Sequence, residues 1–203
     1  AFRHPNLVRL LGVCTKDEPK YMILEFSTGG SLDEWLPANG PKLLKPTAMK
    51  LVHLLHQVSL GMVVLGQAGI VHSDLAARNV LINENLQVKV GDYGLSRDVE
   101  QDKNYYRSKT SRPMPLRWTA PESIAHLKFS AASDVYAFGV LVFEVFSFGA
   151  FPFAAIADDN KLIQFISATA HGRTNSTPVR YASGDVQVHA DAPANIADVC
   201  QPL

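Results

Sequence analysis

The chain has 203 residues, of which 47% are hydrophobic and 19% are charged, a composition that supports a buried core rather than disorder. Nineteen basic residues balance nineteen acidic ones, so the chain lacks the net positive charge that favours nucleic-acid binding. Cys14 and Cys200 are the only cysteines, which argues against a disulfide framework and for a reducing compartment. No unbroken apolar run reaches the ~18 residues of a membrane span, and no signal peptide is recognisable.

The first forty residues predict a β-hairpin followed by a short helix. Residues 7–13 are mostly apolar, residues 16–19 form a turn, and residues 21–26 make a second strand-like run. Gly29 and Gly30 end that run, and Ser31 is a favourable N-cap for a helix that contains Leu32, Trp35 and Leu36. Residues 37–46 predict a loop.

Helical periodicity then dominates the chain. Between residues 47 and 67, apolar side chains recur at helical spacing: Leu51, Leu54, Leu55, Val58, Met62 and Leu65. Residues 80–82 and 88–90 predict short strands around an Asn-rich turn, whereas residues 96–112 are polar and poorly periodic. Residues 133–148 are apolar nearly all round, which predicts an interior helix. Residues 158–170 predict one more amphipathic helix.

Three side chains between residues 74 and 92 suit phosphoryl transfer. Such a reaction requires an aligned acceptor hydroxyl, a group that takes its proton, and metal ions that neutralise phosphate charge. Asp74 follows the long predicted helix, and Asn79 begins the next strand. Asp92 follows the second strand, and Gly94 permits the bend that aims its carboxylate inward. Carboxylate and amide oxygens are the ligands that Mg²⁺ prefers.

The segments His72–Ile82 and Asp92–Gly94 resemble the catalytic and metal-binding loops of eukaryotic protein kinases. The resemblance implies an α+β, protein-kinase-like fold, mainly the helical large lobe with a remnant of the small-lobe sheet. It implies ATP and Mg²⁺ as cofactors, Asp74 as the catalytic base, and Asn79 and Asp92 as metal ligands.

The resemblance is specific to the tyrosine-kinase group. Leu75–Asn79 is similar to the tyrosine-kinase pattern, and it implies that Arg78 is a catalytic cation rather than a surface charge. Residues 115–123 resemble the substrate-side end of the activation segment, where Leu116 would support the acceptor tyrosine. Tyr105 and Tyr106 are candidate phosphorylation sites, against the alternative of loop aromatics without a regulatory role. Together with residues 95–99 they resemble receptors of the insulin-receptor and neurotrophin-receptor type.

Further positions carry over from the same resemblance. Residues 21–31 are similar to the strand and hinge that hold adenine. Leu24 would be the gatekeeper, a role compatible with the plainer reading of an apolar strand residue. The backbone of Glu25 and Ser27 would face adenine, and Leu81 would pack beneath the ring. Residues 133–140 resemble the central helix of the large lobe, in which Asp134 would accept hydrogen bonds from the backbone near His72.

Three departures from the family pattern limit the prediction. Ser73 stands where the family has an arginine that pairs with a phosphorylated activation segment, so this form of control is doubtful. The glycine-rich loop, the helix glutamate and the ATP-binding lysine would precede Ala1, so the chain is read as part of a longer protein. Residues 173–203 lack the family's late pattern, including an arginine for Glu122, and are read as a divergent, poorly ordered tail.

The expected organisation is a partial kinase domain over residues 1–172, with the small-lobe remnant and hinge in 1–28, the large lobe in 29–172, and the tail in 173–203. The expected function is transfer of the γ-phosphoryl group of ATP to tyrosine hydroxyls of proteins. The domain is expected on the cytoplasmic side of a parent protein that crosses the membrane once and dimerises. The expected partners of the domain are ATP and proteins with an acceptor tyrosine, and no nucleic acid is expected. The alternatives are a pseudokinase that serves as a scaffold and an incomplete, inactive fragment.

Overall fold

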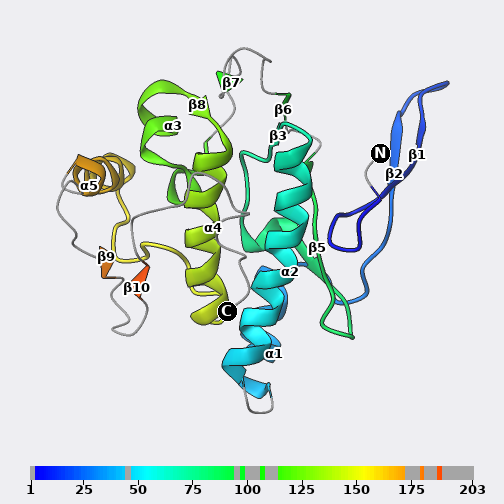
Figure 1. The fold of residues 1–203 in the computed structure, drawn as a ribbon, viewed down its shortest axis with the longest axis horizontal. Coiled ribbons are helices and arrows are strands. Elements are labelled where there is room, and N and C mark those ends of the chain that lie inside the picture. Colours follow the sequence, from blue (N-terminus) through cyan, green and yellow to red (C-terminus); the bar gives the residue numbers. More distant parts are fainter. Residues whose placement is uncertain are drawn as a thin grey trace.

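The computed structural model describes residues 3–43, 47–93 and 114–171, together with the backbone of four two-residue strands at 97–98, 106–107, 179–180 and 187–188. The long helices α2 (Thr47–Gln67) and α4 (Ala131–Phe146) pack against each other at the centre, and short strands and turns surround them (Figure 1). The architecture is the mainly helical α+β fold that the sequence predicts.

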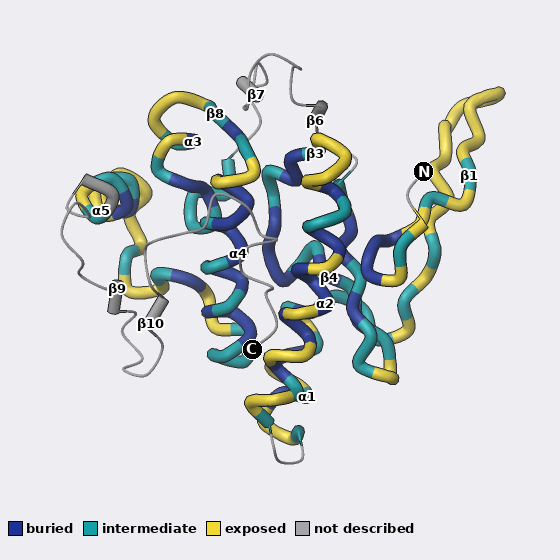
Figure 2. Tube along the Cα trace, in the orientation of Figure 1, coloured by how far each residue is buried: buried dark blue, intermediate teal, exposed yellow. Residues whose placement is uncertain are grey.

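The predicted hairpin is confirmed. Strands β1 (Leu10–Cys14) and β2 (Tyr21–Leu24) pair antiparallel. The hairpin extends from one side of the molecule, and most of its residues are exposed (Figure 2). The segment before it is anchored, because the Val8 N–H donates to the Val90 carbonyl at 2.8 Å and the Val90 N–H donates to the Asn6 carbonyl at 2.9 Å.

Helix α1 (Leu32–Asn39) begins where the sequence predicts, but it differs in two respects. Ser31 is the N-cap residue, yet its side chain makes no capping hydrogen bond; its backbone instead forms an antiparallel bridge with Leu81. The predicted loop from Pro37 is wrong at its start, since the helix continues through Pro37 to Asn39 and into η1 (Gly40–Lys42). Pro37 has no backbone N–H to donate. The helix nevertheless continues for two residues beyond it.

Helix α2 has the predicted bounds, and all six predicted apolar positions are buried. Among the described residues, α2 is the one helix long and apolar enough to cross a membrane by length and composition, with a mean hydropathy of 1.5 over its most apolar stretch. Half of that stretch is buried inside the protein, and its apolar face belongs to the main hydrophobic core. The helix is therefore accounted for as a core helix.

Short strands follow α2 and frame the loop that carries the candidate base. Strand β3 (Ile70–Val71) pairs with β6 (Arg97–Asp98), and η2 (Ala77–Asn79) leads directly into β4 (Val80–Ile82). Strand β4 pairs antiparallel with β5 (Val88–Val90), as predicted. Strand β7 (Tyr106–Arg107) pairs with β8 (Lys128–Phe129).

The remaining helices follow in the C-terminal half of the chain. Turn η4 (Leu116–Trp118) precedes α3 (Pro121–His126), a helix that the sequence analysis missed. Helix α4 begins at Ala131, two residues before its predicted start, because Ser130 and Ser133 form a capping box. Helix α5 (Asp159–His171) agrees with its prediction to within one residue. In 173–203 the described part is one antiparallel pair, β9 (Val179–Arg180) and β10 (Gln187–Val188).

Candidate functional site

The loop from His72 to Asn79 is fixed at its start by a buried carboxylate of α4. The backbone N–H groups of His72 and Ser73 donate to the two Asp134 oxygens at 2.8 and 2.9 Å, as the family resemblance implies. Asp134 is 3% exposed. Burial raises the pKa of Asp134, and the nearby His72 ring and the two backbone N–H groups oppose that rise. The pair of bonds compensates for the cost of placing a carboxylate inside the protein.

The His72 ring joins this loop to the strand that precedes Asp92. His72 is fully buried. Its Nδ1 accepts the Asp74 N–H at 3.3 Å, and its Nε2 lies 2.9 Å from the Gly91 carbonyl oxygen. Because Nδ1 accepts the Asp74 N–H, Nε2 is the ring nitrogen that donates to the Gly91 carbonyl. These contacts make His72 a residue of the protein core.

The Asp74 carboxylate is held by two neighbours on η2. The Arg78 guanidinium forms an ion pair with Asp74 Oδ1. The Asn79 amide Nδ2 donates to Asp74 Oδ2 at 3.0 Å and to the Asp74 carbonyl at 2.6 Å. The structure therefore brings together the three residues predicted as catalytic. The Asp74 side chain keeps 27% of its surface exposed, so it remains open to an acceptor group.

Asn79 and Asp92 lie at neighbouring points of the backbone. The Gly91 N–H donates to the Asn79 carbonyl at 2.8 Å, which places Asp92 one residue from that contact. Asp92 is exposed and has a left-handed φ of +53°. The Asn79 amide nitrogen faces Asp74, so the amide oxygen faces elsewhere and suits a hard cation. Within the described residues, no group of three His, Cys, Asp or Glu side chains has metal-binding geometry.

The ring of Tyr93 ties the segment after Asp92 to the N-terminal strand region. Its hydroxyl donates to the Val8 carbonyl, a bond that phenylalanine could not make. Burial raises the pKa of Tyr93, and the nearby Glu25 carboxylate adds to the rise. Gly94 lies outside the described residues.

The predicted hinge is docked on β4. The Gly29 N–H donates to the Ile82 carbonyl at 2.9 Å, and the Ser27 hydroxyl donates to the same oxygen at 2.6 Å. The Glu25 N–H donates to the Arg9 carbonyl. No described residue donates to the Glu25 carbonyl, and none accepts from the Ser27 N–H. Leu24 is 44% exposed, and Leu81 is partly buried on β4. The backbone groups assigned to adenine are thus available for it.

The Glu25 side chain makes contacts that sequence reasoning missed. Lys89 on β5 donates to both Glu25 oxygens at 3.0 Å, and the Arg9 N–H donates to Oε1 at 2.6 Å. The participants are 16 and 64 positions from Glu25 in the sequence. No local pattern signals a contact at that separation.

The substrate-side segment lies against Arg78. The Arg78 guanidinium sits 4.4 Å from the centre of the Trp118 ring, a cation–π contact. Arg117 donates to three carbonyls of the loop before α5, those of Pro152, Phe153 and Ile156, at 2.7–2.8 Å. Leu116, predicted to support the acceptor, is partly buried beside them. Neither the Trp118 stacking nor the Arg117 contacts were predicted, because both depend on the tertiary fold.

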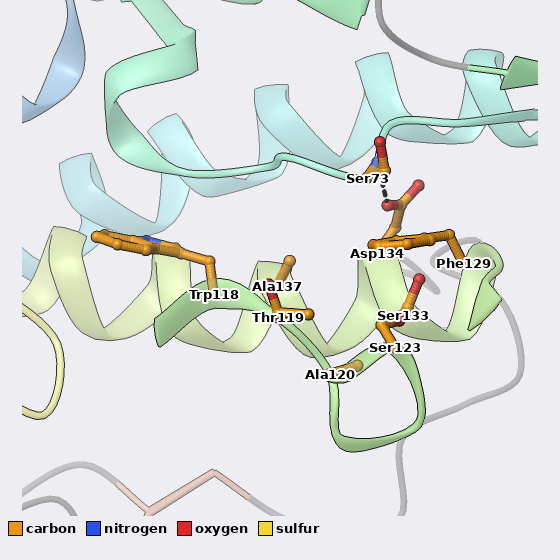
Figure 3. A pocket seen from close by; sticks show the side chains of 9 residues that line it. All are labelled: Ser73, Trp118, Thr119, Ala120, Ser123, Phe129, Ser133, Asp134 and Ala137. Atoms are coloured by element: carbon orange, nitrogen blue, oxygen red, sulfur yellow. Dashed lines mark hydrogen bonds between the residues drawn. The ribbon is translucent and has the colours of Figure 1, made fainter. Parts of the chain in front are cut away.

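Ser73 borders a hollow of about 10 Å³ that is partly open to solvent. Figure 3 shows its side chain above Asp134, with Phe129, Thr119 and Ser123 among the other lining residues. Ser73 has a left-handed φ of +65°, and its position is set by the N–H bond to Asp134. Tyr105 lies outside the described residues, whereas the backbone of Tyr106 pairs with Phe129 in the β7–β8 ladder.

Comparison with known proteins identifies the family. Residues 1–181 match the model of the family described as protein tyrosine and serine/threonine kinase. The chain is 46% identical over 154 residues to ephrin type-B receptor 1 of Gallus gallus, covering 75% of the chain and 15% of that protein. It is 45% identical over 152 residues to ephrin type-A receptor 5 of Homo sapiens, covering 75% of the chain and 14% of that protein.

These relatives are ephrin receptors and not the insulin-receptor or neurotrophin-receptor type expected from the loop around Tyr105 and Tyr106. That part of the expectation rested on the short segment from residue 95 to residue 106 and is wrong. The chain spans about one seventh of the length of these relatives. The family match covers both the anchored loop and the hinge, and the chain belongs to the protein tyrosine and serine/threonine kinase family.

Proposed function

We propose that the protein containing this chain is a tyrosine kinase, which transfers the γ-phosphoryl group of ATP to tyrosine hydroxyls of proteins. The observation that carries the proposal is the Asp74 carboxylate, held between Arg78 and Asn79 in a loop anchored to α4. Such a carboxylate aligns an acceptor hydroxyl without needing to reorganise during the reaction. Family membership supports the use of ATP.

Asp74, Arg78 and Asn79 have distinct roles in the proposed phosphoryl transfer. Asp74 accepts the phenolic proton as the tyrosine oxygen bonds to the γ-phosphorus and the bond from that phosphorus to the β-phosphate oxygen breaks. Arg78 holds the carboxylate, and its charge lies beside the phosphoryl group in transfer. Asn79 keeps Asp74 oriented through its amide nitrogen.

ATP and Mg²⁺ fit the residues present. The Glu25 carbonyl and the Ser27 N–H would take the adenine edge, with Leu24 and Leu81 as apolar contacts. The Asn79 amide oxygen and the Asp92 carboxylate would hold Mg²⁺, which neutralises phosphate charge when bound. The exposure of Asp92 and the orientation of the Asn79 amide support this assignment.

The wider setting is proposed from the same relatives. We place the parent among receptor kinases of the ephrin-receptor kind, with this domain on the cytoplasmic side, a single membrane crossing, and dimerisation through the parent. The catalytic unit is proposed for residues 1–172, with 1–28 as small-lobe remnant and hinge and 29–172 as large lobe. Residues 173–203 are proposed as a divergent tail.

Phosphorylation at Tyr105 and Tyr106 is proposed to control activity only weakly. In kinases with an arginine at position 73, that arginine forms a charge-assisted contact with such a phosphate. Ser73 carries no charge and cannot form it. Ser73 also favours the second candidate function, that of a pseudokinase that binds partners without transferring phosphate.

The test uses the full-length protein with ATP, Mg²⁺ and three peptides that differ only in a central tyrosine, serine or phenylalanine. Phosphate incorporation is expected in the tyrosine peptide alone. Arg78→Lys is expected to lower kcat about ten-fold, because lysine loses the planar stack on Trp118. Nucleotide binding without transfer to any peptide would favour the pseudokinase, and transfer to serine and not tyrosine would contradict the proposal.

A further inference from the structure

Glu144 is a buried carboxylate that joins two parts of the candidate site. It lies on α4 and is 5% exposed. Its Oε2 accepts the Trp118 indole N–H at 2.9 Å and the Ala77 backbone N–H at 3.0 Å. One oxygen atom therefore binds both the substrate-side turn η4 and the catalytic turn η2.

These two bonds bear directly on Arg78. Ala77 is its neighbour in the chain, and the Trp118 ring lies 4.4 Å from its guanidinium. The position of the ring is set by the indole N–H bond to Glu144. Arg78 is consequently held between a ring that Glu144 orients and the Asp74 carboxylate with which it pairs.

Glu144 and Asp134 together fix the whole loop to one rigid element. They lie ten residues apart on α4, a rise of about 15 Å. Asp134 binds the start of the loop at His72 and Ser73, and Glu144 binds its end at Ala77. Asp74 lies between the two attachments, so its position follows that of α4.

We infer that Glu144 is a positioning residue for the acceptor tyrosine: by binding Trp118 and Ala77 it sets the relation between the substrate-side turn and Arg78. The inference rests on the proposed tyrosine kinase function. Its consequence is specific, because the hinge that would hold the nucleotide contacts β4 and not Glu144. Loss of Glu144 should therefore weaken use of the tyrosine substrate far more than use of ATP.

The first measurement is structural, uses the 203-residue chain and does not need activity. The chain has two tryptophans, Trp35 and Trp118, so the indole N–H signals in an NMR spectrum give one reporter and one internal control. Glu144→Leu is expected to shift the Trp118 signal and leave the Trp35 signal in place. Glu144→Gln keeps an acceptor oxygen and should restore much of the wild-type position. Glu84→Gln, in an exposed turn, is the matched control and should change neither signal.

The second measurement is kinetic, in the full-length protein. Glu144→Leu is expected to raise the KM for a tyrosine peptide about ten-fold, the usual scale for losing a hydrogen bond to a charged group, while the KM for ATP stays unchanged. Glu144→Gln should recover most of the peptide KM. If Glu144→Leu fails to fold, Trp118→Phe removes the same indole bond from the other side and should raise the peptide KM in the same direction.

An unshifted Trp118 signal in Glu144→Leu would overturn the inference. So would equal changes in the KM for ATP and for peptide, which indicate a general structural role, or an unchanged peptide KM in Trp118→Phe. A wild-type protein that transfers no phosphate contradicts the proposed function instead, and the indole signals then still decide whether Glu144 holds Trp118.

Discussion

Asp74 combines a charged group with a fixed geometry and partial exposure. Arg78 and Asn79 bind its carboxylate, and His72 accepts its backbone N–H. Charge-assisted hydrogen bonds are the strong ones in proteins, so these contacts limit the rotation of the carboxylate. A surface ion pair of the same type contributes little. The difference here is that the pair is only about one-third exposed and its partners are themselves anchored.

Ser73→Arg tests whether the residue at position 73 limits control by phosphorylation. Both side chains carry a Cβ at the same left-handed φ, so the exchange adds no new type of backbone strain. The activity ratio of phosphorylated to unphosphorylated protein is expected to rise about ten-fold, since an arginine–phosphate contact is charge-assisted. Ser73→Lys supplies charge without the planar fork and should gain less. A ratio that is the same in all three proteins would contradict this account.

Glu144→Gln gives a pH signature in stability. Burial raises the pKa of Glu144 above 4.5, with Asp33 adding to the rise and Trp118, Ala77 and Arg78 opposing it. Between the unfolded and folded pKa values the folded state holds the proton that the unfolded chain has released, so the contribution of Glu144 falls as pH rises. Glutamine does not titrate. The unfolding free energy of the wild type minus that of the variant should therefore decrease upward from pH 4.5, as measured by urea denaturation; a flat or increasing difference would be inconsistent with a raised pKa.

At the scale of elements, the close packing of α2 against the N-terminal segment requires a glycine. A Cβ added at Gly61 would lie 2.6 Å from the Asn6 carbonyl oxygen, whereas one at Gly66 of the same helix meets nothing within 4 Å. Gly61→Ala should destabilise the protein by about 1–3 kcal/mol through overpacking. Gly66→Ala should stabilise it by about 0.5–1 kcal/mol through helix propensity. Urea denaturation of both variants tests the pair, and equal effects would rule out the packing argument.

Elements with a long local signal could be predicted from the sequence. Helix α2 repeats its apolar residues over 21 positions, and the side chains that recur are those that become buried. Helix α3 was missed because its six residues are under two turns, too few to show a period. The extension of α1 through Pro37 was missed because proline usually signals an end.

Across the whole molecule, the same distinction separates the site residues that could be predicted from those that could not. Asp74, Arg78 and Asn79 fall within six residues, so a sequence motif carries them. Trp118 and Glu144 act on Arg78 from 40 and 66 positions away, and only the packing of η4 and α4 against η2 brings them there. Asp134 was predicted at a similar separation because the family resemblance supplied the contact.

The most direct test of the account compares full-length wild-type protein with Asp74→Asn in phosphate transfer from ATP to a tyrosine peptide. Asparagine keeps the size of the side chain and its place beside Arg78 but cannot take the phenolic proton. We expect kcat to fall by about 10²–10⁴-fold, the range for loss of a positioned base, with the KM for ATP little changed. Equal phosphate incorporation by the two proteins would contradict it.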